Sequence, residues 1–277
     1  MQGRQFFPTV KIAGLEVSRL VCGTNSFLGY SHYTAARDQW LRRYFTVDRI
    51  VETLLEAWSQ GINSIVGPCQ ERLAESLKAF TEQTGNRFIW IGTSLGSPDM
   101  AQQKKDLEFL AENGATFGMI HCGYTDTHLL SAEKRVEGLP ELLQYSRSLG
   151  LIPGVSTHRP ETLPVCEAEG YDSEVYILPH NVLGFLSPVE IEWVANIIRQ
   201  TSKPVINIKP LASGKLTPVE GLTYVYSAIK ENDVVCVGLM SPEEARDTAT
   251  VARNILLGKG ERREMVFTPS KSTVQLR

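Results

Sequence analysis

The chain has 277 residues, of which 42% are hydrophobic and 21% are charged, and its formal net charge is -3 at pH 7. This composition is ordinary for a soluble globular protein, and the charge provides no basic surface for a nucleic acid. No apolar run approaches the ~20 residues of a membrane span, and residues 1–8 lack the apolar run of a signal peptide. We therefore expect a cytoplasmic protein that binds neither nucleic acid nor membrane. Its five scattered cysteines should be reduced thiols.

The first predicted element is a β-hairpin, because residues 9–19 form two short apolar runs around a turn at Gly14. Eight apolar runs follow, separated by amphipathic stretches such as 47–58 and 188–198. They lie at 19–23, 63–66, 88–92, 117–120, 152–155, 175–178, 205–208 and 234–237. Such an alternation indicates a parallel sheet covered by helices, and eight units close as a (β/α)8 TIM barrel. We expect one such domain over residues 1–277, with the hairpin plugging the barrel floor.

The connection after the first barrel strand, residues 25–46, is longer than a tight strand-to-helix link requires. It is rich in aromatic residues, among them Tyr30, Tyr33 and Trp40. A long aromatic loop at the catalytic face of a barrel typically forms a lid or a pocket wall. The other interpretation, compatible with the first, is a short helix over 35–43 that packs on the barrel rim.

Three of the candidate strands, read to their full length as 117–121, 152–158 and 175–180, end in histidine, at His121, His158 and His180. If these strands are neighbours, their imidazoles meet at the carboxyl-terminal face, where such barrels place their active sites. Three neutral imidazoles could hold Zn²⁺ or another divalent ion with a position left for water. For His158 and His180 the alternative is a loop histidine bonded to the backbone, since one residue of slip turns a strand side chain outward.

Lys209 also follows a predicted strand and precedes Pro210. An apolar pocket lowers the pKa of a lysine, which can then act as a Schiff-base nucleophile. The alternative is that Lys209 binds an anion or a carbonyl group. Backbone donors over residues 213–215 could add a contact to a phosphate or carboxylate.

Several segments resemble an aldo-keto reductase in their order and spacing, and together they span nearly the whole chain. They are residues 15–24, 61–65, 119–121, 154–156, 209–214 and 241–244. The resemblance implies the barrel fold, a small carbonyl or hydroxylated ligand, and NADP(H) as cofactor. It also implies that His121 corresponds to the catalytic histidine of that family.

The other catalytic positions of the family are not matched. Val66 stands where the family has an aspartate, Ser94 stands where it has a lysine, and residues 67–72 contain no tyrosine. In that chemistry a tyrosine protonates the carbonyl oxygen, and general acid catalysis contributes ~10² to 10⁴ in rate. Standard NADPH-dependent reduction should therefore be impaired or lost, unless Tyr30 or Tyr33 replaces the missing acid.

The cofactor positions that the resemblance implies are also altered. Glu244 stands at a position that resembles that of the family's arginine, which binds the adenosine phosphate. A carboxylate at this position would repel the phosphate. A weakened NADP(H) site is therefore expected. Its contacts would come from Ser156, Thr157, Asn181, Lys209, Leu211, Gly214, Gly238 and Ser241.

Three functions remain open at this point. The first is a divergent aldo-keto-reductase-like protein that binds or transforms a small carbonyl or hydroxylated compound, with His121 as its polar anchor. The second is a metal-dependent hydrolase or lyase that uses His121, His158 and His180. The third is a non-catalytic binding protein. Each takes a small-molecule ligand, and each is compatible with a homo-oligomer.

Overall fold

The computed structural model describes residues 6–259. Its centre is a closed barrel of eight strands, each hydrogen-bonded in parallel to its two neighbours. In barrel order the strands are β3 (Leu20–Gly23), β4 (Ser64–Pro68), β5 (Ile89–Thr93), β6 (Phe117–Ile120), β9 (Ile152–Ser156), β10 (Val175–Pro179), β11 (Val205–Ile208) and β12 (Val234–Gly238). The predicted (β/α)8 barrel is confirmed. The prediction of one domain covers residues 1–277, and residues 1–5 and 260–277 lie outside the described residues. It therefore stays a prediction.

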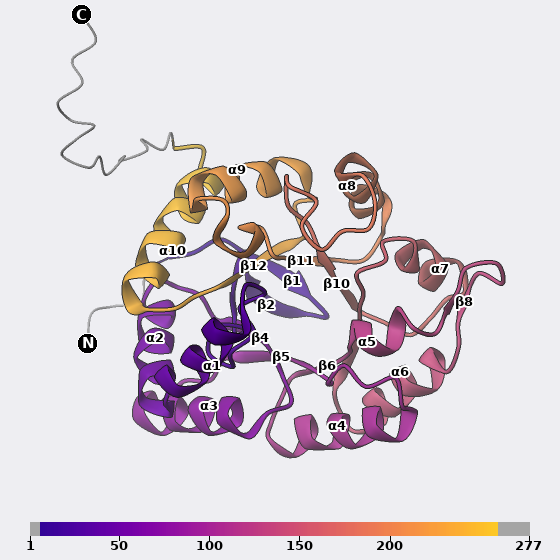
Figure 1. Cartoon of the computed structure of the whole chain (residues 1–277), viewed down its shortest axis with the longest axis horizontal. Coiled ribbons are helices and arrows are strands. Elements are labelled where there is room, and N and C mark those ends of the chain that lie inside the picture. The colour runs from indigo at the N-terminus through magenta and orange to yellow at the C-terminus, as the bar shows by residue number, and fades with distance from the viewer. Residues whose placement is uncertain (1–5, 260–277) are drawn as a thin grey trace, which may run out of the picture.

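The predicted hairpin is present as β1 (Thr9–Ile12) and β2 (Leu15–Ser18), which pair antiparallel. Its turn places Gly14 at φ +83°, a conformation that glycine adopts without strain. Ile12 and Val17 are fully buried and pack with inward-facing barrel residues such as Val21. The hairpin therefore closes the amino-terminal end of the barrel and lies within the ring of helices in Figure 1.

Helices surround the barrel and bury one apolar face each against the strands (Figure 1). None of the helices in residues 6–259 has the length and apolar character needed to cross a bilayer. The helices between and after the strands are α2 (Val47–Ser59), α3 (Glu71–Thr84), α4 (Met100–Glu112), α6 (Leu139–Ser148), α7 (Thr162–Ala168), α8 (Ile191–Gln200), α9 (Pro218–Ala228) and α10 (Pro242–Leu256).

Smaller elements lie in the connections at the carboxyl ends of the strands. Residues 25–46 contain α1 (Ala35–Tyr44), close to the short helix considered for 35–43. A lid function for this segment stays a prediction. The other small elements are α5 (Cys122–Thr125), β7 (Leu129–Leu130), β8 (Arg135–Val136) and the 3₁₀ turn η1 (Ala212–Gly214).

Strand side chains alternate between the barrel interior and the helix layer, as the period of two requires. The interior cluster includes Phe117 and Met119 of β6 and Ile177 of β10. The side chains between them, such as Ile120 and Leu178, belong to the cluster shared with the helices. This phase decides which strand-end residues reach the catalytic face and which do not.

Candidate active site

A cavity of about 790 Å³ opens at the carboxyl ends of the barrel strands, where (β/α)8 enzymes place their active sites. Its walls come from the strand ends, from the segments after β3 and β11, and from the start of α10. Most of the site residues expected from the sequence lie in this lining: Tyr30, Tyr33, His121, Ser156, His158, Lys209, Leu211, Gly214 and Gly238.

His180 is not part of the lining, so the structure does not bring the three strand-end histidines together. Ile177 faces the barrel interior, and His180, three residues later, therefore has the opposite phase. The His180 side chain is 1% exposed, with its ring edge-on to Tyr224 at 5.4 Å between centroids. Its Nδ1 lies 3.2 Å from Oδ1 of Asn207 in the helix-facing layer.

Three other expected cofactor residues also make contacts away from the cavity. Thr157 donates its hydroxyl hydrogen to Asp126. The side-chain amide of Asn181 forms hydrogen bonds with the backbone of Phe185 in its own loop. Ser241 caps the start of α10, because its hydroxyl accepts a hydrogen bond from the backbone amide of Glu244. The N-cap role of Ser241 follows from the Ser-Pro-Glu-Glu pattern. Cofactor contacts from these three residues stay predictions.

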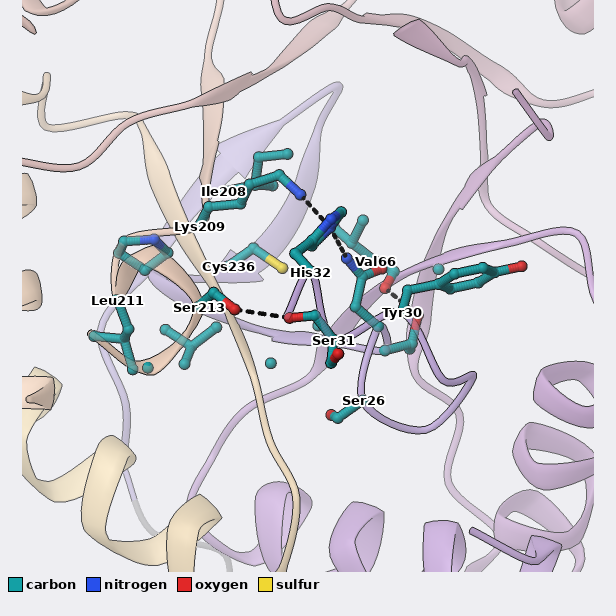
Figure 2. Close-up of a pocket in the computed structure, with 18 of the residues that line it drawn as sticks. Ser26, Tyr30, Ser31, His32, Val66, Ile208, Lys209, Leu211, Ser213 and Cys236 are labelled. Carbon is teal, nitrogen blue, oxygen red and sulfur yellow. Dashed lines mark hydrogen bonds between the residues drawn. The ribbon is translucent and has the colours of Figure 1, made fainter. Parts of the chain in front are cut away.

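Lys209 and His32 both line the cavity, and Figure 2 shows their side chains pointing toward each other. The Lys209 Nζ lies 2.8 Å from Nε2 of His32, and Nδ2 of Asn25 lies 3.2 Å from the same nitrogen. Because the amine and the amide nitrogen are both donors, Nε2 is the acceptor and the ring proton sits on Nδ1. Burial lowers the pKa of Lys209 to about 8.

The imidazoles of His121 and His158 line the same cavity in neutral form. His121 Nδ1 accepts from the Gly123 amide at 3.0 Å, so its proton is on Nε2. Burial lowers the pKa of His121, and the charge of Lys209 lowers it further. Burial, again with a contribution from Lys209, lowers the pKa of His158 to about 4. The cavity thus combines neutral imidazoles with one amine.

The positions that differ from the reductase pattern line the cavity with an apolar side chain, are held in buried hydrogen bonds, or lie at the rim. Val66 lines the cavity with an apolar side chain. Ser94 is fully buried, donates its hydroxyl hydrogen to Gln103, and accepts from the His121 amide at 3.0 Å. The Tyr30 hydroxyl accepts from the Gln70 amide at 2.6 Å, and Tyr33 is 71% exposed.

Acidic side chains face the cavity at the start of α10. Glu244 and Asp247 both belong to the lining, and Glu244 Oε2 accepts from the Met240 amide at 2.9 Å. The positive end of the α10 dipole is therefore occupied by the helix's own carboxylates. Arg37 of α1 brings a positive charge to the same wall.

One group of possible metal ligands lies within the described residues. The ligand atoms of Cys122, Asp126 and His158 are within 4.8 Å of one another. Asp126 accepts from the Thr157 hydroxyl and, at 3.0 Å, from the His158 amide, so its carboxylate already stabilises the segment after β9. The three-histidine set expected from the sequence shares only His158 with this group.

Comparison with known proteins gives a result at the level of the fold. No protein-family model matches the chain, and no curated protein matches it. Among solved structures, a Pseudomonas aeruginosa protein assigned to the aldo-keto reductases is 19% identical with a TM-score of 0.66, covering 90% of this chain and 94% of that chain. An aldo-keto reductase from Bacillus halodurans is 11% identical with a TM-score of 0.52, covering 91% and 90%. The resemblance predicted from the sequence is confirmed in the fold.

Two further structures show how much can be concluded from this structural similarity. A variant of the protein Gox0644 in complex with NADPH is 12% identical with a TM-score of 0.58, covering 89% of this chain and 88% of that chain. A truncated 3-deoxy-D-arabino-heptulosonate 7-phosphate synthase from Thermotoga maritima is 14% identical with a TM-score of 0.54, covering 91% and 94%. Since a reductase and a synthase share the barrel, activity has to be argued from the site.

Proposed function

We propose that this chain is a divergent member of the aldo-keto reductase superfamily that binds and transforms a small carbonyl or hydroxylated compound in the barrel cavity. The observation that carries the proposal is the set of polar groups directed into that cavity. His121 keeps an Nε2–H that can donate to a carbonyl or hydroxyl oxygen, and Lys209 brings an amine to the same space. A concave, partly apolar site with a few convergent polar groups is the usual form of a small-molecule site.

We further propose that standard NADPH-dependent reduction is weakened or lost. The Tyr30 and Tyr33 side chains lie at the rim, and Val66 and Ser94 supply neither a proton donor nor a charge that would tune one. The α10 wall also fits a phosphorylated cofactor poorly, because the carboxylates of Glu244 and Asp247 outnumber the guanidinium of Arg37 on that wall. No hydride-transfer step is therefore assigned to this site.

A fluorescence titration with NADPH tests this part of the proposal. We expect weak binding to the unaltered protein and roughly tenfold tighter binding to Glu244→Arg, because the change replaces a repelling charge by a pairing one. Glu243→Arg is the matched control, since Glu243 lies in the same helical turn and outside the cavity lining. Tight binding by the unaltered protein, or an equal gain in the control, would contradict the proposal.

A metal-dependent hydrolase or lyase is the second candidate, favoured by the Cys122, Asp126 and His158 group. An ion bound there could activate a water molecule for attack on a substrate. Metal analysis of protein purified without an affinity tag provides the test. Stoichiometric zinc that is lost in Cys122→Ser and retained in His180→Phe would favour this candidate, and metal-free active protein would exclude it.

A further inference from the structure

Lys209 is a partly buried amine that has no anionic partner among residues 6–259. The ion pairs in residues 6–259 join other cations to carboxylates, and none of them includes Lys209. The partner of Nζ is the neutral Nε2 of His32, which also accepts from Asn25. An ammonium that is partly withdrawn from water without a counterion is unfavourable, so the neutral amine gains population. The lowered pKa of Lys209, about 8, agrees with this geometry.

The backbone directs this amine into the cavity through an unusual conformation. Lys209 has φ +62°, and the residue before a proline rarely adopts the left-handed region. The surrounding segment is held in place by a hydrogen bond of 2.7 Å from the Ser213 hydroxyl to the Ser31 carbonyl, drawn in Figure 2. Backbone strain of this kind is frequent at functional sites and persists where neighbouring contacts maintain it.

We propose that Lys209 forms an imine with the carbonyl carbon of a small aldehyde or ketone bound in the cavity. The inference rests on the proposed function, namely that the cavity takes a small carbonyl compound, and adds the covalent chemistry that the site performs on it. The chemistry is that of a lyase or isomerase, because imine formation transfers no electrons between substrate and cofactor.

The steps balance without a further reactant. The lone pair of Nζ attacks the carbonyl carbon, a C–N bond forms, and the π electrons move to the oxygen. The two hydrogens of the amine then leave nitrogen as protons and join that oxygen, which departs as water and leaves a C=N bond. Hydrolysis reverses these steps and restores the amine.

Two histidines are placed to assist these proton movements. His32 Nε2, 2.8 Å from Nζ, is an acceptor that can take each proton from nitrogen and pass it to the departing oxygen. His121 can polarise the carbonyl through its Nε2–H, because the Gly123 amide occupies Nδ1. The imine nitrogen then takes up a proton from solvent water through His32, and the resulting iminium group withdraws electrons from the adjacent C–H or C–C bond, as C–C cleavage or isomerisation requires.

Reductive trapping tests the proposal. The full-length protein is incubated with glycolaldehyde or dihydroxyacetone and sodium cyanoborohydride, and the adduct is located by peptide mass spectrometry. Lowering the pKa of Lys209 from 10.5 to about 8 raises its neutral fraction at pH 7 by roughly two orders of magnitude. We expect the label at Lys209 to exceed that at Lys215, an exposed lysine of the same segment, by at least about tenfold.

Two variants and a binding measurement complete the experiment. Lys209→Met should lose the adduct, and Lys215→Met should keep it. Mapping the labelled lysine in the unaltered protein provides the test even if a variant does not fold. Binding of the same two probes is followed in parallel by saturation-transfer NMR. Probe that binds without preferential labelling of Lys209 overturns the imine and leaves the proposed function standing. Absence of binding by every carbonyl probe overturns both.

Discussion

The pH dependence of stability should report on His180, which lies outside the active site in the helix-facing layer. Asn207 donates its amide hydrogens to the carbonyls of Val205 and Val234, so its oxygen is directed at His180. The Nδ1 of His180 must then be the donor. Its Nε2 is buried and has no hydrogen-bond partner in the described part of the chain. Burial accordingly lowers the pKa of His180 to about 4.

The sign and size of the effect follow from linkage between protonation and folding. In the unfolded chain the histidine titrates near 6.5, and in the folded protein it titrates near 4, so the unfolded state binds the proton first as the pH falls. The stabilisation is fully present above pH 6.5 and is lost between pH 6.5 and 4. A difference of about 2.5 pKa units corresponds to about 3 kcal/mol.

Urea unfolding at pH 7, 5.5 and 4.5 measures this loss against His180→Phe, which cannot titrate. At pH 7 the variant should be less stable by about 1–3 kcal/mol, because the Asn207 oxygen loses its donor. The difference between the two proteins should shrink and then reverse as the pH falls, since only the unaltered protein loses the contribution of His180. Parallel stability curves over this range would refute the pKa assigned to His180.

Two further predictions concern the groups around the cavity. A Cβ at Gly123 would lie 2.4 Å from the carbonyl oxygen of Gly96, so Gly123→Ala should displace the donor of His121 and destabilise the protein by about 1–3 kcal/mol. Thermal unfolding measures this, and an unchanged melting temperature would refute the close contact. Any residual NADPH-dependent reduction should change less than about twofold in Tyr30→Phe and Tyr33→Phe, because both side chains lie at the rim. A loss of tenfold or more in a steady-state assay would instead make one of them the proton donor.

The barrel could be predicted because its signals are local. Each strand is a short apolar run followed by an amphipathic helix, and the observed bounds of the strands lie within about two residues of the predicted ones. The hairpin follows from its turn at Gly14, and the cap at Ser241 follows from the acids after Pro242. These patterns depend on residues adjacent in the chain, so they can be recognised without the tertiary structure.

For part of the candidate site, the prediction failed because the sequence did not fix the direction in which side chains at the strand ends point. His121 and His180 both end a predicted strand, yet one side chain faces the cavity and the other faces the helices. The difference depends on how many residues separate each histidine from the last inward-facing strand position. Sequence reasoning locates that position only to within a residue or two, and a single residue reverses the direction.

The sequence by itself determined the eight strand-and-helix units and placed His121 and Lys209 at strand ends, since both conclusions rest on local pattern. Only the tertiary structure decided what Lys209 contacts. Its partner His32 is 177 residues away in the chain, in the segment after β3, and closure of the barrel brings that segment beside the end of β11. The physical reason is that the environment of a partly buried amine, and hence its charge, depends on groups that no local pattern encodes.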